Sequence, residues 1–435
     1  MSKLLNDNSR CNVKGLFSVS PMLFFILLFI FIFLLTGNIY KISLSVVFTI
    51  SSVYALYTLK NRSITERIKV FSRGAGQENL MLMLWIFVLA GAFAQTAKDI
   101  GAIDAVVRVA LHFLPSHLIL AGLFVTACFV SLSIGTSVGT VAALVPIATG
   151  IATSTGQPTA MLVAAVVGGA FFGDNLSFIS DTTIASTKTQ GCELKDKFKA
   201  NFLIVLPAAI ITVIIYIFTN SQSQYSTEIT AIDYIKMLPY IIILVSAICG
   251  MNVFVVLAVG NLLSGITGMA LGVCNMEDWF VSAGNGIMSM GELIIISMLA
   301  GGMLEVIREN GGIEYIINKL SSHIHCKRGG ELIIGAMVGI TNLCTANNTI
   351  AILSVGKIAK SISTRFGINP CKAASILDTF SCVVQGLIPY GAQFLIASGL
   401  SHVQPTNILP YIYYPVIVGI TAIIGIIIRY PKKYS

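Results

Sequence analysis

The sequence predicts an all-α polytopic membrane protein, built as an inverted-topology repeat with broken or re-entrant helices. Three observations carry this prediction: apolar runs recur along the chain, basic residues gather on one side of the expected spans, and the two halves share a residue pattern. Of the 435 residues, 55% are hydrophobic and 11% are charged, whereas soluble domains carry about 25% charged residues. The mean hydropathy of +0.86 indicates many spans and not one anchor on a soluble body.

The apolar runs are long enough for helices that cross a bilayer, which takes about 20 residues per span. They are continuous and lack the alternation of a barrel, so helices are expected. The first run is interpreted as a retained helix and not a signal peptide, because no small-residue cleavage site follows it. The expected spans are 20–36, 42–58, 79–97, 117–133, 135–155, 159–173, 200–219, 238–256, 257–273, 288–307, 331–345, 347–364, 373–385 and 409–428. The shorter ones are candidates for half-helices or re-entrant segments.

The basic residues indicate how the chain is oriented. If the N-terminus is cytoplasmic and every span crosses, all but four of the 27 Lys and Arg residues fall on the cytoplasmic side, which is the positive-inside pattern. The four exceptions are Lys41, Lys98, Arg108 and Lys236. This distribution explains the net charge of +8 by membrane topology, so no nucleic-acid partner is expected. The chain is expected to be an integral, multi-pass protein of the cell inner membrane.

The two halves of the chain resemble each other. Residues 89–104 line up with residues 299–314 at a constant separation of 210, and residues 135–138 fall opposite residues 346–349. An offset of seven spans is odd, so equivalent elements must run in opposite directions. We therefore expect two inverted repeats, at 1–219 and 220–435, with about seven spans each. Such repeats are typical of secondary transporters.

Other classes of site lack a signal. The nine cysteines form no CxxC pair and the five histidines are dispersed, so neither a zinc site nor a disulfide framework is indicated. No phosphate-binding Gly-x-x-x-x-Gly-Lys-Ser/Thr motif is present in the sequence, so ATP-driven pumping by this chain is not expected. We expect that the protein is not an enzyme and needs no cofactor. We expect transport to be driven by an ion gradient.

The densest polar run at membrane depth follows the sixth expected span. Asp174 and Asp181 are seven positions apart, about two helical turns, so both could face one seam if the stretch is helical. Ser177, Ser180 and Thr182 add hydroxyl groups beside them. Carboxylate, hydroxyl and freed carbonyl oxygens are the ligands of hard cations, and polar groups at this depth indicate an ion path. The alternative is a cytoplasmic loop with an N-cap Asp or Ser.

Two further polar interruptions occupy equivalent places in the two halves. The first contains Thr136 and Ser137, and the second contains Asn347 and Asn348. Helix breaks of this kind expose backbone groups that can hold an ion or an anion. Small hydroxyl residues also serve in helix packing, but the matching positions favour a site.

Asp378 is a carboxylate in an otherwise apolar run. Because burial favours the neutral form of a carboxyl group, this residue is a candidate proton carrier; the alternative is that it reaches the membrane interface. Gln385 and the break at 386–393 extend the polar surface of the second half. Glu305 is expected to form a structural pair with Arg308, one turn away.

At these motifs the sequence resembles the NhaC-type sodium/proton antiporter family, over roughly residues 80–428. Residues 173–183, Gly-Asp-Asn-Leu-Ser-Phe-Ile-Ser-Asp-Thr-Thr, resemble the family's Gly-Asp-x-x-Ser-Pro-x-Ser-Asp-Thr signature, and residues 135–140 resemble its Gly-Thr-Ser-x-Gly-Thr segment. The resemblance implies exchange of cytoplasmic sodium for external protons. By the motif, Asp174, Ser177, Ser180, Asp181 and Thr182 become the ion-site residues. Phe178 stands where the signature has Pro, which leaves the transported solute open.

The expected function is sodium/proton exchange by alternating access. Asp174 or Asp181 would bind sodium or a proton in competition, because protonation removes the charge that holds the cation. The alternative is sodium- or proton-coupled transport of a small organic acid or amino acid. A membrane-embedded aspartyl enzyme and a channel are both disfavoured, since neither explains broken inverted repeats. The expected partners are the lipid bilayer and the transported solutes, with a homodimer left open.

Overall fold

The computed structural model is built from helices in all the parts that it describes, which are residues 2–36, 43–60, 62–113, 115–178, 180–219, 233–249, 251–321 and 326–434. Lys41, expected on the outer side, lies outside these ranges. The first half of the chain contains α1 (Ser2–Thr36), α2 (Leu44–Thr58), α3 (Ile64–Ala75), α4 (Glu78–Asp99), α5 (Ala102–Phe113), α6 (Ile119–Ile134), α7 (Ser137–Thr155), α8 (Thr159–Leu176), α9 (Asp181–Gln190) and α10 (Leu194–Thr219).

The second half repeats this series. It contains α11 (Leu238–Ile248), α12 (Val253–Ala270), α13 (Met276–Ser289), α14 (Gly291–Glu309), α15 (Gly312–Ser321), α16 (Lys327–Thr345), α17 (Asn348–Phe366), α18 (Pro370–Gln385), α19 (Ala392–Ser401), α20 (Pro405–Ile408) and α21 (Tyr413–Ile427). Helix α4 ends at Asp99 and α14 at Glu309, which keeps the separation found in the sequence. The predicted all-helical, inverted-repeat fold class is confirmed. The repeat boundary at 219/220 stays a prediction, because residues 220–232 are not described.

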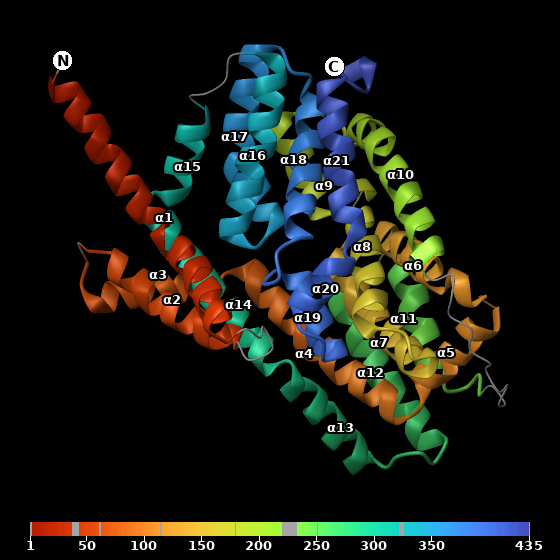
Figure 1. Cartoon of the computed structure of the whole chain (residues 1–435). Coiled ribbons are helices and arrows are strands. Elements are labelled where there is room, and N and C mark those ends of the chain that lie inside the picture. Colours follow the sequence, from red (N-terminus) through yellow and green to blue (C-terminus); the bar gives the residue numbers. More distant parts are fainter. Residues whose placement is uncertain are drawn as a thin grey trace.

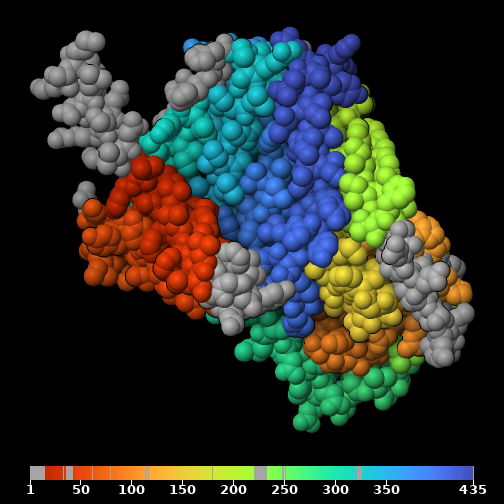
Figure 2. All heavy atoms as spheres, viewed as in Figure 1, coloured from red at the N-terminus to blue at the C-terminus, as the bar shows by residue number. Residues whose placement is uncertain are grey.

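The two halves interlock through matching contacts. Helices α2 and α3 of the first half pack on α14 of the second, and α12 and α13 of the second half pack on α4 of the first. Glycines allow these close crossings: a Cβ atom at Gly74 would lie 2.4 Å from the Gly301 carbonyl oxygen, and one at Gly91 would lie 2.4 Å from that of Gly286. In the space-filling view, residues of the C-terminal part lie between the N-terminal helices and α8 and α10 (Figure 2).

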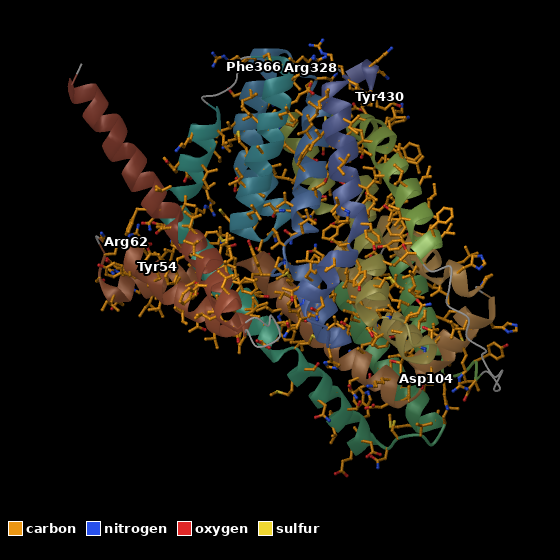
Figure 3. The ribbon with its side chains drawn as sticks, in the orientation of Figure 1. Tyr54, Arg62, Asp104, Arg328, Phe366 and Tyr430 are labelled. Carbon is orange, nitrogen blue, oxygen red and sulfur yellow. The ribbon has the colours of Figure 1, made fainter. Side chains whose placement is uncertain are left out.

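Two helical hairpins enter the molecule from opposite ends. In the first, α6 leads into α7, whose far end packs on α5; in the second, α16 leads into α17 (Figure 1). Arg328 and Phe366, at the open ends of the second hairpin, lie together with Tyr430 at one end of the molecule, and Asp104 on α5 lies at the other (Figure 3). This arrangement agrees with repeats that run in opposite directions.

The hairpins and breaks explain why several expected spans are short. Among the described residues, seven helices are long and apolar enough to cross a membrane, or eight if the bent pair Pro405–Tyr411 and Tyr413–Ile427, at 53°, is counted as one span. Helices α6 and α19 are apolar but only 16 and 10 residues long. The expected spans at 331–345 and 347–364 form the second hairpin. Their shared turn lies inside the protein and not at its outer surface.

Candidate functional site at the meeting point of the two hairpins

Both hairpin tips are built the same way. Helix α6 is followed by the C-cap residue Gly135, in the left-handed region with φ 75°, and α16 is followed by the C-cap residue Ala346, with φ 47°. Thr136 and Asn347 then take the N-cap positions of α7 and α17. Each tip therefore presents the free N–H groups of a helix start, and Asn347 satisfies one of them by accepting a hydrogen bond from the Ile350 N–H at 3.0 Å.

The polar run after α8 is a second kind of break. Helix α8 ends at Leu176 and α9 begins at Asp181. Asp174 and Asp181 therefore do not lie on one face of a single helix, which was the expectation if the stretch were continuous. The described residues between the two helices, Ser177, Phe178 and Ser180, are not helical, and the hydroxyl group of Thr182 donates to the carbonyl oxygen of Asp174 at 3.1 Å. This bond partly replaces the helical bond that the break removes.

A cavity of about 360 Å³ lies where the tips and this break meet. Eight of the ten predicted site residues line it: Thr136, Ser137, Asp174, Ser180, Asp181, Thr182, Asn347 and Asn348. Two predicted residues, Ser177 and Asp378, do not. The wall is completed by apolar residues of α4 and by residues 251–254 at the start of α12. Nothing in the sequence pattern singled out residues 251–254, since their place follows from tertiary packing.

A chain of hydrogen bonds crosses this cavity from one half to the other. The Asp174 carboxylate accepts from the Ser137 N–H at 3.0 Å and from the Ser137 hydroxyl at 2.5 Å. Gln393 donates to the Ser137 oxygen at 2.8 Å and accepts from the Gln385 amide at 3.0 Å. Gln385 in turn donates to the Ala346 carbonyl at 3.0 Å. The first hairpin tip is thereby connected to the second.

The two carboxylates differ in their surroundings. Asp174 is 4% exposed and holds the tip of α7, whereas Asp181 is exposed at the cavity wall. Among the described residues, no side chain forms an ion pair with either one. The Gln385 side-chain oxygen, also in the wall, is buried without a hydrogen-bond donor in the described part of the chain. Together these oxygens form a donor set suited to a hard cation such as sodium.

Asp378 is not the isolated carboxylate that its apolar neighbours suggested. It is fully buried and forms an ion pair with Lys197 of α10, which is 1% exposed. Its side chain is enclosed by protein and does not reach the protein surface, as the alternative of an interfacial carboxylate required. From the sequence, Lys197 is expected in a cytoplasmic loop, since it stands between Lys195 and Lys199 in a charged stretch. Only the packing of α10 against α18 reveals it.

Ser177 and Glu305 have structural positions. Ser177 is the C-cap of α8, and its N–H donates to the Gly173 carbonyl at 2.7 Å. Glu305 lies 3.9 Å from Arg308, as expected, but its nearer partner is Arg73, at 2.9 Å. That ion pair joins α3 to α14, and Arg73 also reaches Glu309 at 2.7 Å.

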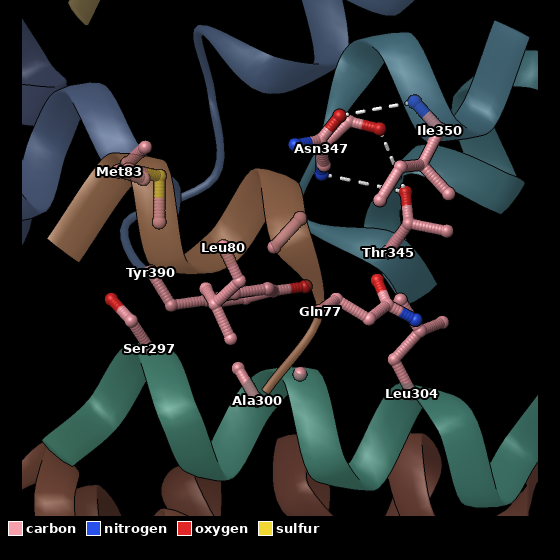
Figure 4. Close-up of a pocket in the computed structure, with 13 residues that line it drawn as sticks. Gln77, Leu80, Met83, Ser297, Ala300, Leu304, Thr345, Asn347, Ile350 and Tyr390 are labelled. Carbon is pink, nitrogen blue, oxygen red and sulfur yellow. Dashed lines mark hydrogen bonds between the residues drawn. The ribbon is translucent and has the colours of Figure 1, made fainter. Parts of the chain in front are cut away.

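A smaller cavity of about 40 Å³ lies beside the second tip. The N-cap residue Gln77 lines it together with Leu80 and Met83 of α4, and α14 contributes Ser297, Ala300 and Leu304 (Figure 4). Thr345 and Asn347 of the tip close it, so it adjoins the larger cavity at the tip. The Gln77 amide also donates to Glu305 at 3.3 Å, which connects this region to the α3–α14 ion pairs.

The family model described as "Na+/H+ antiporter family" matches residues 12–221 and 223–428. The chain belongs to this family. It is 25% identical over 398 residues to the Na(+)/H(+) antiporter NhaC of Bacillus subtilis, covering 82% of this chain and 85% of that protein. It is 25% identical over 292 residues to NhaC of Alkalihalophilus pseudofirmus, covering 59% and 62%. The predicted NhaC-type resemblance is confirmed, and with it the class of integral multi-pass transporter.

A solved structure of the YdaH transporter of Alcanivorax borkumensis is similar at 10% identity with a TM-score of 0.45, covering 89% of this chain and 99% of that one.

Proposed function

We propose that the protein exchanges sodium for protons across the cell inner membrane by alternating access, with Asp174 and Asp181 as the carboxylates for which the two cations compete. One observation carries the proposal: the cavity where both hairpin tips meet is lined by these two carboxylates and by hydroxyl and amide groups from both halves. Membership of the Na+/H+ antiporter family supports the choice of ions.

Competition follows from the chemistry of the carboxylates. A sodium ion in the cavity needs their negative charge, together with neutral oxygens such as those of Thr136 and Asn347. A proton on the same oxygen removes that charge, so one site cannot hold both cations. Sodium released on one side is replaced by a proton from that same side, and the proton released on the other side is replaced by sodium, so the two movements are coupled without any nucleotide or cofactor.

Alternating access follows from the hairpins. They enter from opposite ends and their tips share one cavity, so a displacement of the tips relative to α4 and α14 would expose the carboxylates to one side or the other. Broken helices at such a meeting point are the usual architecture of secondary carriers. Helices α4 and α14, which pack extensively against α12 and α13 and against α2 and α3 of the opposite half, would form the fixed frame.

The test is sodium-driven proton movement in proteoliposomes. The Asp181→Asn variant, which keeps the size of the side chain, should lose exchange while inserting normally. Asp104→Asn is the matched control, because Asp104 is exposed at the far end of the molecule. Full exchange by Asp181→Asn would overturn the assignment. Sodium-dependent uptake of a labelled organic acid or amino acid, without proton exchange, would establish the alternative substrate class.

A further inference from the structure

A buried cation, Lys197, lies next to the candidate site but outside its cavity. Lys197 of α10 donates to the carbonyl oxygen of Asn175 at 2.9 Å and to the Thr183 hydroxyl at 2.7 Å, and it forms an ion pair with Asp378. All three ammonium protons thus have acceptors within the described residues. Two of these acceptors belong to the break between α8 and α9.

The break creates the need for this cation. A helix end leaves its last carbonyl groups without helical N–H partners, and here that end is buried. The Thr182 hydroxyl donates a hydrogen bond to the Asp174 carbonyl oxygen. The side chains of Lys197 and Asn201 both donate to the Asn175 carbonyl oxygen, each at 2.9 Å. A cation at this position also stabilises the negative end of the α8 dipole.

The second half of the chain supplies the counter-charge. Asp378 of α18 accepts from Lys197 and, at 2.9 Å, from Asn201. Ser375 of the same helix donates to the Asn201 side-chain oxygen. Because a buried charge without a partner is strongly unfavourable, Asp378 allows Lys197 to remain charged beneath the break. The network therefore fastens the end of α8 in the first half to α18 in the second.

We propose that Lys197 is a positioning residue for cation binding, and that Asp378 is its counter-ion and not a proton carrier. The ammonium group fixes the α8–α9 break, and with it the distance between Asp174, one residue before Asn175, and the tip of α7. This inference rests on the proposed function for its transport readout only, since the geometry of the break can be measured without transport.

Transport of sodium tests the positioning role. Lys197→Met should raise the half-saturating sodium concentration about tenfold or more, the size of effect expected for a lost hydrogen bond to a charged group. Lys197→Arg should restore most of it. The double variant Lys197→Met/Asp378→Asn is decisive, because it balances the charge but leaves the Asn175 carbonyl without its cation. It should remain impaired, and sodium saturation like that of the unmodified protein would overturn the proposal. Lys199→Met, at an exposed position two residues away, is the control.

Thiol labelling tests the geometry independently of the transported ion. A Ser180→Cys side chain should react slowly with a membrane-impermeant maleimide, since Ser180 is 1% exposed. Its labelling, followed by mass spectrometry of that peptide, should become markedly faster when combined with Lys197→Met but not with Lys199→Met. Unchanged labelling would overturn the positioning role even if sodium exchange is confirmed. Faster labelling would support it even if the transported solute proves to be another one.

Discussion

Ser137 holds both oxygens of the Asp174 carboxylate, one through its backbone N–H at 3.0 Å and one through its hydroxyl group at 2.5 Å. The donor is the first residue of α7, so the carboxylate is fixed to the tip of the first hairpin. The same serine oxygen accepts from Gln393 of the second half. Asp174 is therefore connected through Ser137 to both halves of the protein, and a cation bound there would affect both.

Removing the Ser137 hydroxyl should weaken cation binding. Ser137→Ala keeps the backbone bond to Asp174 but loses the second one, which is worth about 1.5–3 kcal/mol when one partner is charged. We expect the half-saturating sodium concentration to rise roughly tenfold or more, measured by dye quenching in everted vesicles. Ser133→Ala is the control, because Ser133 is half-buried and its hydroxyl donates to the carbonyl of Phe129 in its own helix. Equal effects of the two changes would contradict the role of Ser137.

Breaking the link between the tips should affect the balance between conformations. Gln393→Met has nearly the same volume but neither donates to Ser137 nor accepts from Gln385. The loss of these neutral bonds should cost about 1 kcal/mol each and should favour states in which the tips are apart. We expect a changed exchange rate together with increased maleimide labelling at an Asn348→Cys side chain. An unchanged labelling rate would mean that the link does not hold the tips together.

The crossing of α6 and α8 should not tolerate a larger residue at Gly173. A Cβ atom there would lie 2.1 Å from the Ser131 hydroxyl oxygen and 2.4 Å from the Ser131 carbonyl carbon. We expect Gly173→Ala to destabilise the protein by about 1–3 kcal/mol through overpacking, seen as a lower melting temperature in detergent. Gly168→Ala on the same helix is the control, since its nearest neighbour would be the Tyr414 Cβ atom at 3.4 Å. Similar melting of both variants would contradict the close crossing.

Cys192 and Cys371 should form a disulfide under oxidising conditions at alkaline pH. The two thiols interact with each other, and burial raises the pKa of Cys192, between α9 and α10, to about 12. The thiolate is the reactive form, so at neutral pH little of it is present. The cross-linking rate should rise about tenfold per pH unit below that pKa. Mass spectrometry of the linked peptides gives the rate, and Cys371→Ser should abolish the product. A rate independent of pH would contradict the burial of Cys192.

The sequence predicted those parts of the site that follow from pattern. Thr136 and Asn347 were found because the two halves repeat, and Asp174 and Asp181 because carboxylates are rare at membrane depth. The hairpins were harder to foresee, since an apolar run of 16 to 19 residues is compatible with a full span and with a segment that turns back inside the protein. The break after Leu176 was left open by the sequence, because the polar run beyond the expected span 159–173 is compatible with a further helix and with a loop.

The charge network could not be predicted from local sequence. Lys197 and Lys199 look alike in a run of alternating charges, yet one is buried and the other is exposed. Their difference is set by the face of α10 that meets α8 and α18. Asp378 was singled out for the right reason, its burial, but its partner lies 181 positions away. A buried carboxylate in this fold is therefore interpreted correctly only when its cation is known.

The meeting of two hairpin tips near the centre has an electrical consequence. An ion at such a point is separated from each aqueous phase by only part of the insulating layer, and whichever side is open carries almost none of the membrane voltage. The whole membrane potential then falls across the thin layer of protein that closes the other side of the site. A potential of 100 mV across that layer is worth about 2.3 kcal/mol for each elementary charge. In the proposed exchange, a small movement of the tips would transfer that voltage drop from one side of the bound ion to the other, so the ion would be carried through the field while travelling only a short distance itself.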